Sequence, residues 1–402
     1  MQIVGQSTLL GRFAFGPNIL ILNGDKWKAQ RMIANPAFHR SLPVSLFGQL
    51  TQELFCTMDT MLDSPIDFHD LMERWALDAI GRAGFDFDFH AISKPNNEWV
   101  DRYGNIMKAM MEIRYVIFPI LERFFLPLLP KRRQIHKELD VFLDMLQSII
   151  DKKRQDLSGV DLSGMNHSEK DLLTLMLEAS AEGNGRMTDE EIKSNLCIFF
   201  AAGHDTTANS LSYMAYYLAR HPDIQQKARE EAIKVLGNES TDILPTKDQL
   251  RNMPYINQII KETLRINSPV AGLIGRVAAQ DTDLDGVFIP KGTRVMCSLY
   301  ELHHNPSVWK NPEEFNPDRF APNGEAEKLA GIGFAWLPFS NGSRQCIGMN
   351  FSMTEQRVLL SMLLRKYELL LPEDSIHKDR IVTRGFFIVS PVDMKINCKK
   401  LY

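Results

Sequence analysis

One cysteine near the C-terminus lies in a loop whose neighbouring residues would suit a metal-bound thiolate. The stretch from Phe339 to Gly348 reads FSNGSRQCIG and leads into the helix-forming residues 353–360. Cys346 can supply a soft, anionic sulfur ligand, and the start of a helix favours that negative charge. Gly342 and Gly348 allow backbone angles and close approach that a side chain would prevent.

Two further side chains of this stretch fit the same chemistry. Phe339 can shield the sulfur from water, and Arg344 offers a fixed cation to an acidic cofactor group. A lone cysteine is usually a buried structural residue, but five specified residues coincide by chance on the order of once per million starting points. The stretch resembles the cysteine-ligand loop of the cytochrome P-450 superfamily, the haem-thiolate monooxygenases.

A second polar group lies within a long apolar helix. A capping box of Thr188 and Glu191 begins this helix, which is predicted to continue to about Leu218, roughly 45 Å at 1.5 Å per residue. Its centre contains the sequence AGHDTT, with an acid and an alcohol after the glycine. Buried polar groups need partners, so this pattern alone fits a bent structural helix as well as a functional one.

The resemblance gives that sequence a role, because an acid followed by an alcohol is the family's oxygen-activation motif. It implies that Thr206 hydrogen-bonds bound dioxygen and that Asp205 helps to deliver protons. His204 points to another face of the helix and is expected to be structural.

Glu262 and Arg265 stand three residues apart on a helix predicted from Pro254 to Ile266. Alone, such a pair is usually a solvated ion pair of small energetic value. The later sequence FNPDRF contains Arg319, and the resemblance implies that this arginine also binds Glu262. The three charged residues would then form a network that holds the proline-rich loop beneath the haem. We assign them to the scaffold.

The remaining cofactor contacts rest on the resemblance. Trp27 and Arg31 lie four residues apart and share a helix face. The family uses such a pair to bind a haem propionate, and Arg276 resembles another propionate partner. The glycine spacing matches no phosphate-binding loop, which leaves the supply of electrons to another protein.

Composition narrows the class of protein. The chain has 402 residues, 44% hydrophobic and 24% charged, which is ordinary for a globular protein. Its net charge of −4 gives no basic field for nucleic acid. The five cysteines are an odd number, which argues against a disulfide framework and for a reducing compartment.

The sequence contains no apolar run long enough for a transmembrane helix and no signal peptide. The apolar stretch 116–130 is interrupted by Glu122, Arg123 and three prolines, so it is either core or a segment that dips into a lipid interface. Only twenty-six residues precede Trp27, where family members carry an anchor, a first helix and strands. We therefore expect an N-terminally truncated chain with low solubility or weak activity.

The predicted fold is mainly α with small β-sheets, a single cytochrome P-450 domain over residues 1–402 with haem between the long helix and the Cys346 loop. Further predicted elements are surface loops at 158–168 and 181–186, a hairpin of 287–289 with 293–297, and helices at 53–62, 71–83, 134–155 and 223–236.

The reaction that the resemblance implies is insertion of one oxygen atom of dioxygen into a small lipophilic substrate, with haem b as cofactor. Electrons would come from NADPH through a cytochrome P-450 reductase, with cytochrome b5 as a second candidate donor, at the cytosolic face of the endoplasmic reticulum. The expected pocket residues are Phe199, Phe200 and Ala202, 270–274, and 386–388. The alternatives are a haem-thiolate isomerase or dehydratase, against which the acid–alcohol pair speaks, and a catalytically impaired haem-binding fragment.

Overall fold

The computed structural model describes residues 7–14, 16–39, 42–94, 96–110, 112–159, 170–181, 187–330 and 334–402. The chain divides into two compact units. The first unit comprises residues 1–60, 70–208 and 350–355, and the second comprises 61–69, 209–349 and 356–402. Helices dominate, and the strands form small antiparallel sheets, which confirms the predicted fold class.

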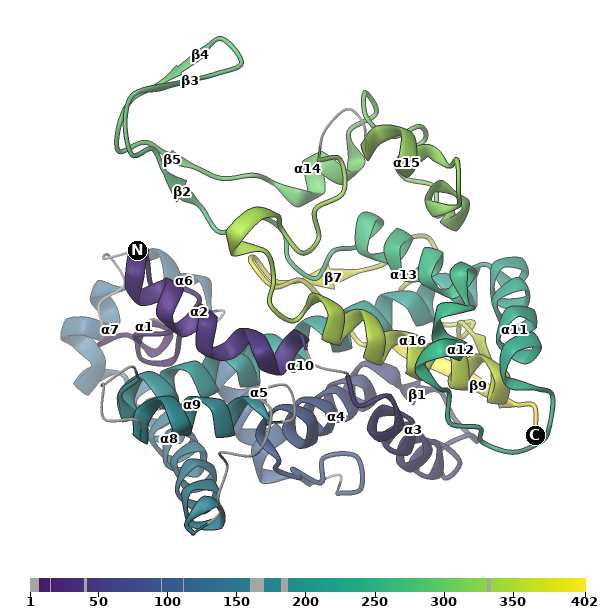
Figure 1. Cartoon of the computed structure of the whole chain (residues 1–402), viewed down its shortest axis with the longest axis horizontal. Coiled ribbons are helices and arrows are strands. Elements are labelled where there is room, and N and C mark those ends of the chain that lie inside the picture. The colour runs from purple at the N-terminus through teal and green to yellow at the C-terminus, as the bar shows by residue number, and fades with distance from the viewer. Residues whose placement is uncertain are drawn as a thin grey trace. The chain divides into compact units, whose positions relative to one another are not determined.

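Helices make up the first unit (Figure 1). Within it, α8 packs against both α5 and α9. The helices are α1 (Leu9–Ala14), α2 (Gly24–His39), α3 (Val44–Met58), α4 (Phe68–Ile80, in this unit from Asp70), a π-helical turn (Gly81–Phe85), α5 (Glu98–Met110), α6 (Ile113–Ile117), α7 (Ile120–Phe125), η2 (Leu126–Leu128), α8 (Pro130–Leu157), α9 (Leu172–Ala181) and α10 (Asp189–Arg220, in this unit as far as Ala208).

An aromatic cluster forms the centre of this unit. Phe200 of α10 is fully buried, and its ring centroid lies 5.1 Å from those of Tyr103 and Phe142. Phe89 and Trp99 complete the set at 5.3 and 6.1 Å from Phe200. Tilted and edge-to-face contacts of this kind add to the apolar area that the rings bury. They fix the middle of α10 against α5 and α8.

The second unit combines helices with the small sheets (Figure 1). β9 lies between β1 and β6 in a three-stranded sheet. Three strand pairs, β2–β5, β3–β4 and β7–β8, form separate ribbons. The helices after α10 are α11 (Pro222–Leu236), α12 (Lys247–Arg251), α13 (Pro254–Ile266), α14 (Leu299–His304), η4 (Pro317–Phe320), α15 (Glu325–Ala330), η5 (Gly342–Arg344) and α16 (Met349–Lys366). The strands are β1 (Ile66–Asp67), β2 (Arg276–Val277), β3 (Thr282–Leu284), β4 (Val287–Ile289), β5 (Arg294–Val295), β6 (Tyr367–Leu370), β7 (Thr383–Arg384), β8 (Ser390–Pro391) and β9 (Lys395–Lys400).

The predicted hairpin of 287–289 with 293–297 is wrong in its pairing. β4 pairs instead with β3 across Asp285 and Gly286, whose φ angles are +52° and +82°. An Asp-Gly pair with both φ angles positive is the preferred two-residue hairpin turn. β5 pairs with β2, so the β3–β4 ribbon extends from the β2–β5 pair and stands away from the helices of its unit (Figure 1).

The long buried helix is confirmed as α10, and Thr188 and Glu191 form the predicted capping box at its start. The helix predicted at 53–62 is instead α3, which begins at Val44 and ends at Met58. Most of the predicted loops at 158–168 and 181–186 fall on residues 160–169 and 182–186, outside the described residues. Among the helices that the structure describes, none is long and apolar enough to cross a membrane.

Candidate functional site

The loop that carries Cys346 is held in place by hydrogen bonds within its own backbone. The Cys346 N–H donates to the Phe339 carbonyl at 2.9 Å, and the Gln345 N–H donates to that of Gly342 at 3.1 Å. Ser340 and Gly342 have φ angles of +59° and +69°, in the left-handed region. Glycine occupies that region without steric cost, which accounts for Gly342. The loop therefore presents Cys346, whose thiol is exposed, shortly before α16 begins.

Gly348 has a different environment from the one expected. Its backbone angles are ordinary, with φ at −84°, and a β-carbon there would lie 3.9 Å from the Cys346 sulfur. That separation is a normal van der Waals contact, so the protein by itself places no backbone requirement for glycine at this position. Phe339 and Arg344, by contrast, are both half-buried in the same loop.

The segment before the loop is tied to α13 and α14. The Leu337 N–H donates to Nε2 of His303 at 3.0 Å, and the Trp336 indole donates to the Lys261 carbonyl at 3.1 Å. His303 is fully buried, and burial lowers its pKa to about 3. Its ring is therefore neutral at physiological pH, which leaves Nε2 free to accept this hydrogen bond.

Glu262 lies between two arginines in the same unit. Both of its carboxylate oxygens accept from Arg265, at 2.8 and 2.9 Å, and one also accepts from Arg319 at 3.3 Å. The Asn316 N–H donates to this oxygen at 2.9 Å. Burial raises the pKa of Glu262, and its hydrogen bonds with Arg265 oppose that effect. Removing one partner from such a network would leave a buried charge without compensation.

In the first unit, Thr206 lies on the accessible face of α10. Its Oγ1 donates to the Ala202 carbonyl one turn earlier, at 3.0 Å. Thr206 is half-buried and Ala202 is exposed. The hydroxyl therefore stands where a small molecule could reach it.

Asp205 is buried, with 9% of its surface exposed, and its contacts were not predictable from the motif. The Tyr103 hydroxyl donates to Oδ2 at 2.5 Å, and Nε2 of His204 lies 3.0 Å from Oδ1. Nδ1 of His204 lies 2.7 Å from the Phe200 carbonyl. His204, which was expected to be structural, is buried and also contacts the acid.

Sequence reasoning also missed Glu355. Its Oε1 accepts from the Thr207 hydroxyl at 2.8 Å, and Ser352 Oγ lies 2.9 Å from the same hydroxyl. Glu355 is fully buried, and burial raises its pKa well above the usual range. Its spacing of nine residues after the cysteine was the only available signal.

The predicted propionate partners lie in both units. Trp27 is buried and Arg31 half-buried on α2 of the first unit. Arg276 is exposed on β2 of the second unit, which also contains Arg344. The structure thus describes all four side chains, and their assignment to the cofactor stays a prediction.

The predicted pocket residues divide into two kinds. Phe200 belongs to the buried aromatic cluster, so its assignment to a pocket is wrong. Phe199 is also buried, with its ring 5.7 Å from that of Phe38. Phe386 and Phe387 are 76% and 39% exposed in the second unit. These two rings are apolar and accessible, as a lipophilic ligand would require.

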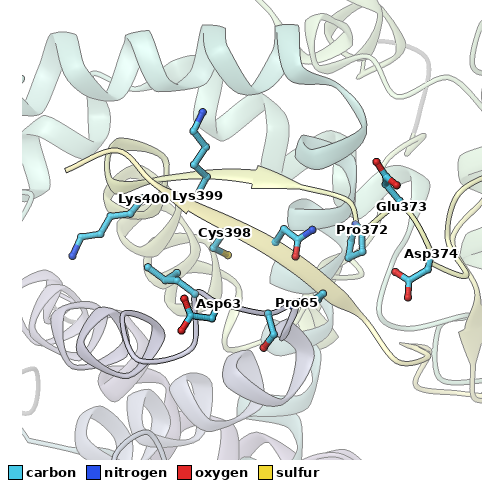
Figure 2. Close-up of a pocket in the computed structure, with 11 residues that line it drawn as sticks. Asp63, Pro65, Pro372, Glu373, Asp374, Cys398, Lys399 and Lys400 are labelled. Atoms are coloured by element: carbon cyan, nitrogen blue, oxygen red, sulfur yellow. The ribbon is translucent and has the colours of Figure 1, made fainter.

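A surface hollow of about 490 Å³ lies elsewhere in the second unit, beside β9 (Figure 2). Its lining mixes carboxylates such as Asp63 and Glu373 with Lys399 and Lys400. No residue of the Cys346 loop or of α10 lines it. We therefore do not assign the catalytic site to this hollow.

The donor set fits a haem. The described residues contain no group of three or more His, Cys, Asp and Glu side chains that could hold a metal ion by themselves. One accessible thiol on a backbone-constrained loop would suit an iron whose nitrogen ligands come from a porphyrin. Fold and donor set together define a haem-thiolate enzyme.

The chain belongs to the cytochrome P450 family, because the family model described as "Cytochrome P450" matches residues 7–396. It is 32% identical to human cytochrome P450 4A11, over 88% of this chain and 68% of the relative. It is 30% identical to a pig taurochenodeoxycholic 6 alpha-hydroxylase, over 96% and 76%. The crystal structure of the cytochrome P450DA heme domain superposes with a TM-score of 0.83 and 25% identity, over 99% of this chain and 83% of that one. The expected reaction class, a haem-thiolate monooxygenase with haem b, is thereby confirmed.

Proposed function

We propose that this protein hydroxylates a small lipophilic substrate, with electrons from NADPH through a separate reductase and cytochrome b5 as a second candidate donor. A substrate C–H bond, dioxygen, two electrons and two protons would yield an alcohol and water. The observation that carries the proposal is the exposed thiol of Cys346, held by the backbone just before α16.

In this proposal, Cys346 holds the haem iron through Sγ, and Phe339 limits the access of water to that sulfur. Arg344, Trp27, Arg31 and Arg276 hold the propionates, as guanidinium and indole donors can. When bound, the haem supplies the activation of dioxygen, which no amino-acid side chain provides.

The protons would come from the acid–alcohol pair on α10. Thr206 Oγ1 now donates to the Ala202 carbonyl, so rotation about χ1 would free its proton for a ligand on the accessible side. Asp205 would help to replace that proton, and its buried carboxylate accepts a hydrogen bond from the Tyr103 hydroxyl. Their roles are the ordinary ones of a general acid and its relay.

Accessible apolar side chains support the proposed substrate class. Phe386 and Phe387 offer rings, and the Phe387 carbonyl accepts from Ala271 N–H at 3.0 Å, which fixes this turn to the segment after α13. One pig relative is named a taurochenodeoxycholic 6 alpha-hydroxylase. A lipophilic molecule, with or without a polar end, fits these features.

We also propose that the α6–η2 segment contacts a lipid surface. Ile117, Phe124 and Leu128 are 60%, 63% and 75% exposed. Exposed Arg123 and Lys131 lie close to them in the sequence. Apolar side chains next to cations suit the interface of an anionic membrane, which supports the expected location at the endoplasmic reticulum.

We expect both units to work as one catalytic domain, because the family match from residue 7 to residue 396 includes both. The test is to load the whole chain with haem, record the spectrum of the reduced, CO-bound form, and measure NADPH use and product with added reductase. A thiolate-type spectrum with reductase-dependent product supports the proposal. A thiolate-type spectrum without reductase-dependent turnover of any lipophile would instead favour an isomerase, a dehydratase or an impaired haem protein.

A further inference from the structure

A histidine outside every motif lies at the open end of the β7–β8 hairpin, whose turn carries Phe386 and Phe387. The register of the two strands places Val382 opposite Val392, one position beyond the paired strands. The Val392 N–H donates to the Val382 carbonyl at 3.0 Å. His377, which is fully buried, makes its contacts with these two residues.

The imidazole of His377 bridges the two strands. The Val382 N–H donates to Nδ1 at 3.0 Å, and Nε2 lies 2.9 Å from the Val392 carbonyl. A carbonyl only accepts, so Nε2 carries the proton and the ring is a neutral imidazole. Opposite residues of a hydrogen-bonded antiparallel pair exchange two N–H···O bonds. Here the ring takes the place of the second bond.

The surroundings of His377 favour this neutral form. Burial lowers the pKa of His377, and the backbones of Val392 and Asp393, together with the Asp393 carboxylate, oppose that effect. The ring of Tyr216 on α10 packs against the imidazole, with the centroids 6.0 Å apart. Burial raises the pKa of the Tyr216 phenol, so this neighbour is uncharged. Both ring nitrogens of His377 are therefore available at physiological pH for the contacts described above.

The two strands of the hairpin are held unequally. On the β8 side, the Val389 N–H donates into the segment 269–271 at 2.8 Å, and the Phe387 carbonyl accepts from the same segment at 3.0 Å. The Tyr213 hydroxyl donates to the Val389 carbonyl at 2.8 Å. In the part of the chain that the structure describes, β7 pairs with β8 alone. The position of β7 therefore depends on that short ladder and on His377.

The turn transmits the position of β7 to Phe386. Gly385 has a φ angle of +119°, and a β-carbon there would lie 2.0 Å from the Ile388 carbonyl oxygen. The chain thus turns tightly directly after β7. Phe386 follows this glycine and is 76% exposed. A shift of β7 would move the Phe386 ring, because no residue between them can absorb the change except Gly385.

We propose that His377 is a positioning residue for the substrate: its imidazole completes the β7–β8 ladder and thereby fixes the Phe386 ring against the apolar part of the substrate. This inference rests on the proposed function, in which Phe386 contacts a lipophilic molecule. It assigns part of the affinity for that molecule to a buried side chain outside the Cys346 loop and the acid–alcohol pair.

The first test measures backbone protection and needs neither haem nor turnover. His377→Asn keeps an acceptor near the place of Nδ1, His377→Gln keeps a donor near the place of Nε2, and His377→Leu keeps neither. We expect the Val382 amide to exchange its hydrogen on the order of tenfold faster in the leucine and glutamine variants, and less so in the asparagine variant. Mass spectrometry of the peptide that contains β7 records this rate. Wild-type exchange in His377→Leu would overturn the role of the ring.

The second test measures ligand binding to the haem-loaded protein through the absorption change that follows coordination of the iron. Imidazole reports on the iron site alone, whereas dodecylimidazole adds an alkyl chain that needs apolar contacts. We expect His377→Leu to weaken dodecylimidazole on the order of tenfold and to leave imidazole unchanged, with partial rescue in His377→Asn. His304→Leu is the control, because Nδ1 of His304 lies 2.9 Å from the Tyr300 carbonyl within α14. Equal effects on the two probes, or no effect on either, would overturn the proposal.

A double-mutant cycle tests the route through Phe386. Phe386→Ala should also weaken dodecylimidazole relative to imidazole, and adding His377→Leu to that variant should cause no further loss. Losses that add in the double variant would show that His377 does not act through this ring. A missing thiolate-type spectrum would refute the proposed function, whereas the exchange measurement decides separately whether His377 holds β7.

Discussion

Gly203 lies against Ile80 so closely that a β-carbon on the glycine would stand 2.8 Å from the Ile80 Cγ1 atom. The residue immediately before the His-Asp-Thr sequence of α10 is therefore glycine because α4 packs onto the helix there.

We expect Gly203→Ala to destabilise the protein by up to about 2 kcal/mol, because overpacking in a core costs about 1–3 kcal/mol and offsets a gain of about 1 kcal/mol in helix propensity. Gly104→Ala is the matched control, since Gly104 lies inside α5 with no atom near its missing β-carbon, and it should gain about 0.5–1 kcal/mol. Urea unfolding of both variants measures these changes. A stabilised Gly203→Ala protein would contradict the packing argument.

Cys346→Ser should abolish the thiolate-type spectrum of the reduced, CO-bound protein, because a neutral hydroxyl is a poor ligand for this iron. Cys297→Ser provides the control, since Cys297 is also an exposed thiol of the second unit. Its spectrum should match the wild type. The assignment of the ligand fails if the serine variant at 346 keeps the thiolate band.

Thr206→Ala should leave haem bound but divert electrons to peroxide, with product per NADPH reduced on the order of a hundredfold, the lower end of the contribution of a positioned proton donor. Thr206→Ser retains the hydroxyl on the accessible face of α10 and should preserve most of the coupling. Product and peroxide are quantified against NADPH consumed. Unchanged coupling in the alanine variant would remove Thr206 from the mechanism.

Acid should lower the free energy of unfolding through His303, which lies in the second unit. Its pKa of about 3 in the folded protein lies below the ordinary value of about 6.5. On acidification, the unfolded chain therefore binds a proton that the folded chain does not bind. This contribution to stability is complete above pH 6.5 and is lost as the pH falls toward 3. At pH 5 the loss from this group is about 2 kcal/mol.

The measurement is the free energy of unfolding at pH 7 and pH 5. His303→Gln should reduce the difference between the two pH values, while the same change at exposed His39 should leave it as in wild type. If the two variants have the same pH dependence, His303 does not control it.

The α6–η2 segment should bind vesicles that contain anionic lipid. Phe124→Ser combined with Leu128→Ser should weaken binding by about tenfold, because each side chain would lose part of the roughly 1.5–3 kcal/mol that full burial provides. Phe288→Ser is the control, since Phe288 is similarly exposed, at 65%, on the β3–β4 ribbon. Vesicle co-sedimentation that responds equally to both changes would exclude a specific contact surface.

Local signals predicted much of the helical part of the fold. The capping box at Thr188 set the start of α10, and its apolar centre indicated burial. The pairing of the strands was harder to predict, because residues 287–289 have several possible partner segments at similar distances along the sequence. The Asp285-Gly286 turn was the signal that would have selected the correct one.

In the candidate site, too, residues within local sequence patterns were predictable, whereas contacts between distant residues were not. The motifs identified Cys346, Asp205 and Thr206 because each lies in a short local pattern. Tyr103 stands 102 residues before Asp205, and no local pattern links the two. Contacts of this kind depend on how whole helices pack, and the aromatic cluster that aims Tyr103 exists only in the folded protein.

The guanidinium groups of the Glu262 network also bind main-chain oxygens of the segment before η4. Arg265 donates to the His303 and Glu314 carbonyls, and Arg319 donates to those of Lys310 and Asn311. The course of this segment is therefore encoded largely outside it, in two arginines that recognise its backbone rather than its side chains. Its exposed positions are free to diverge in evolution or to accept engineered tags, whereas replacing either arginine with lysine would remove the fork of donors that shapes it.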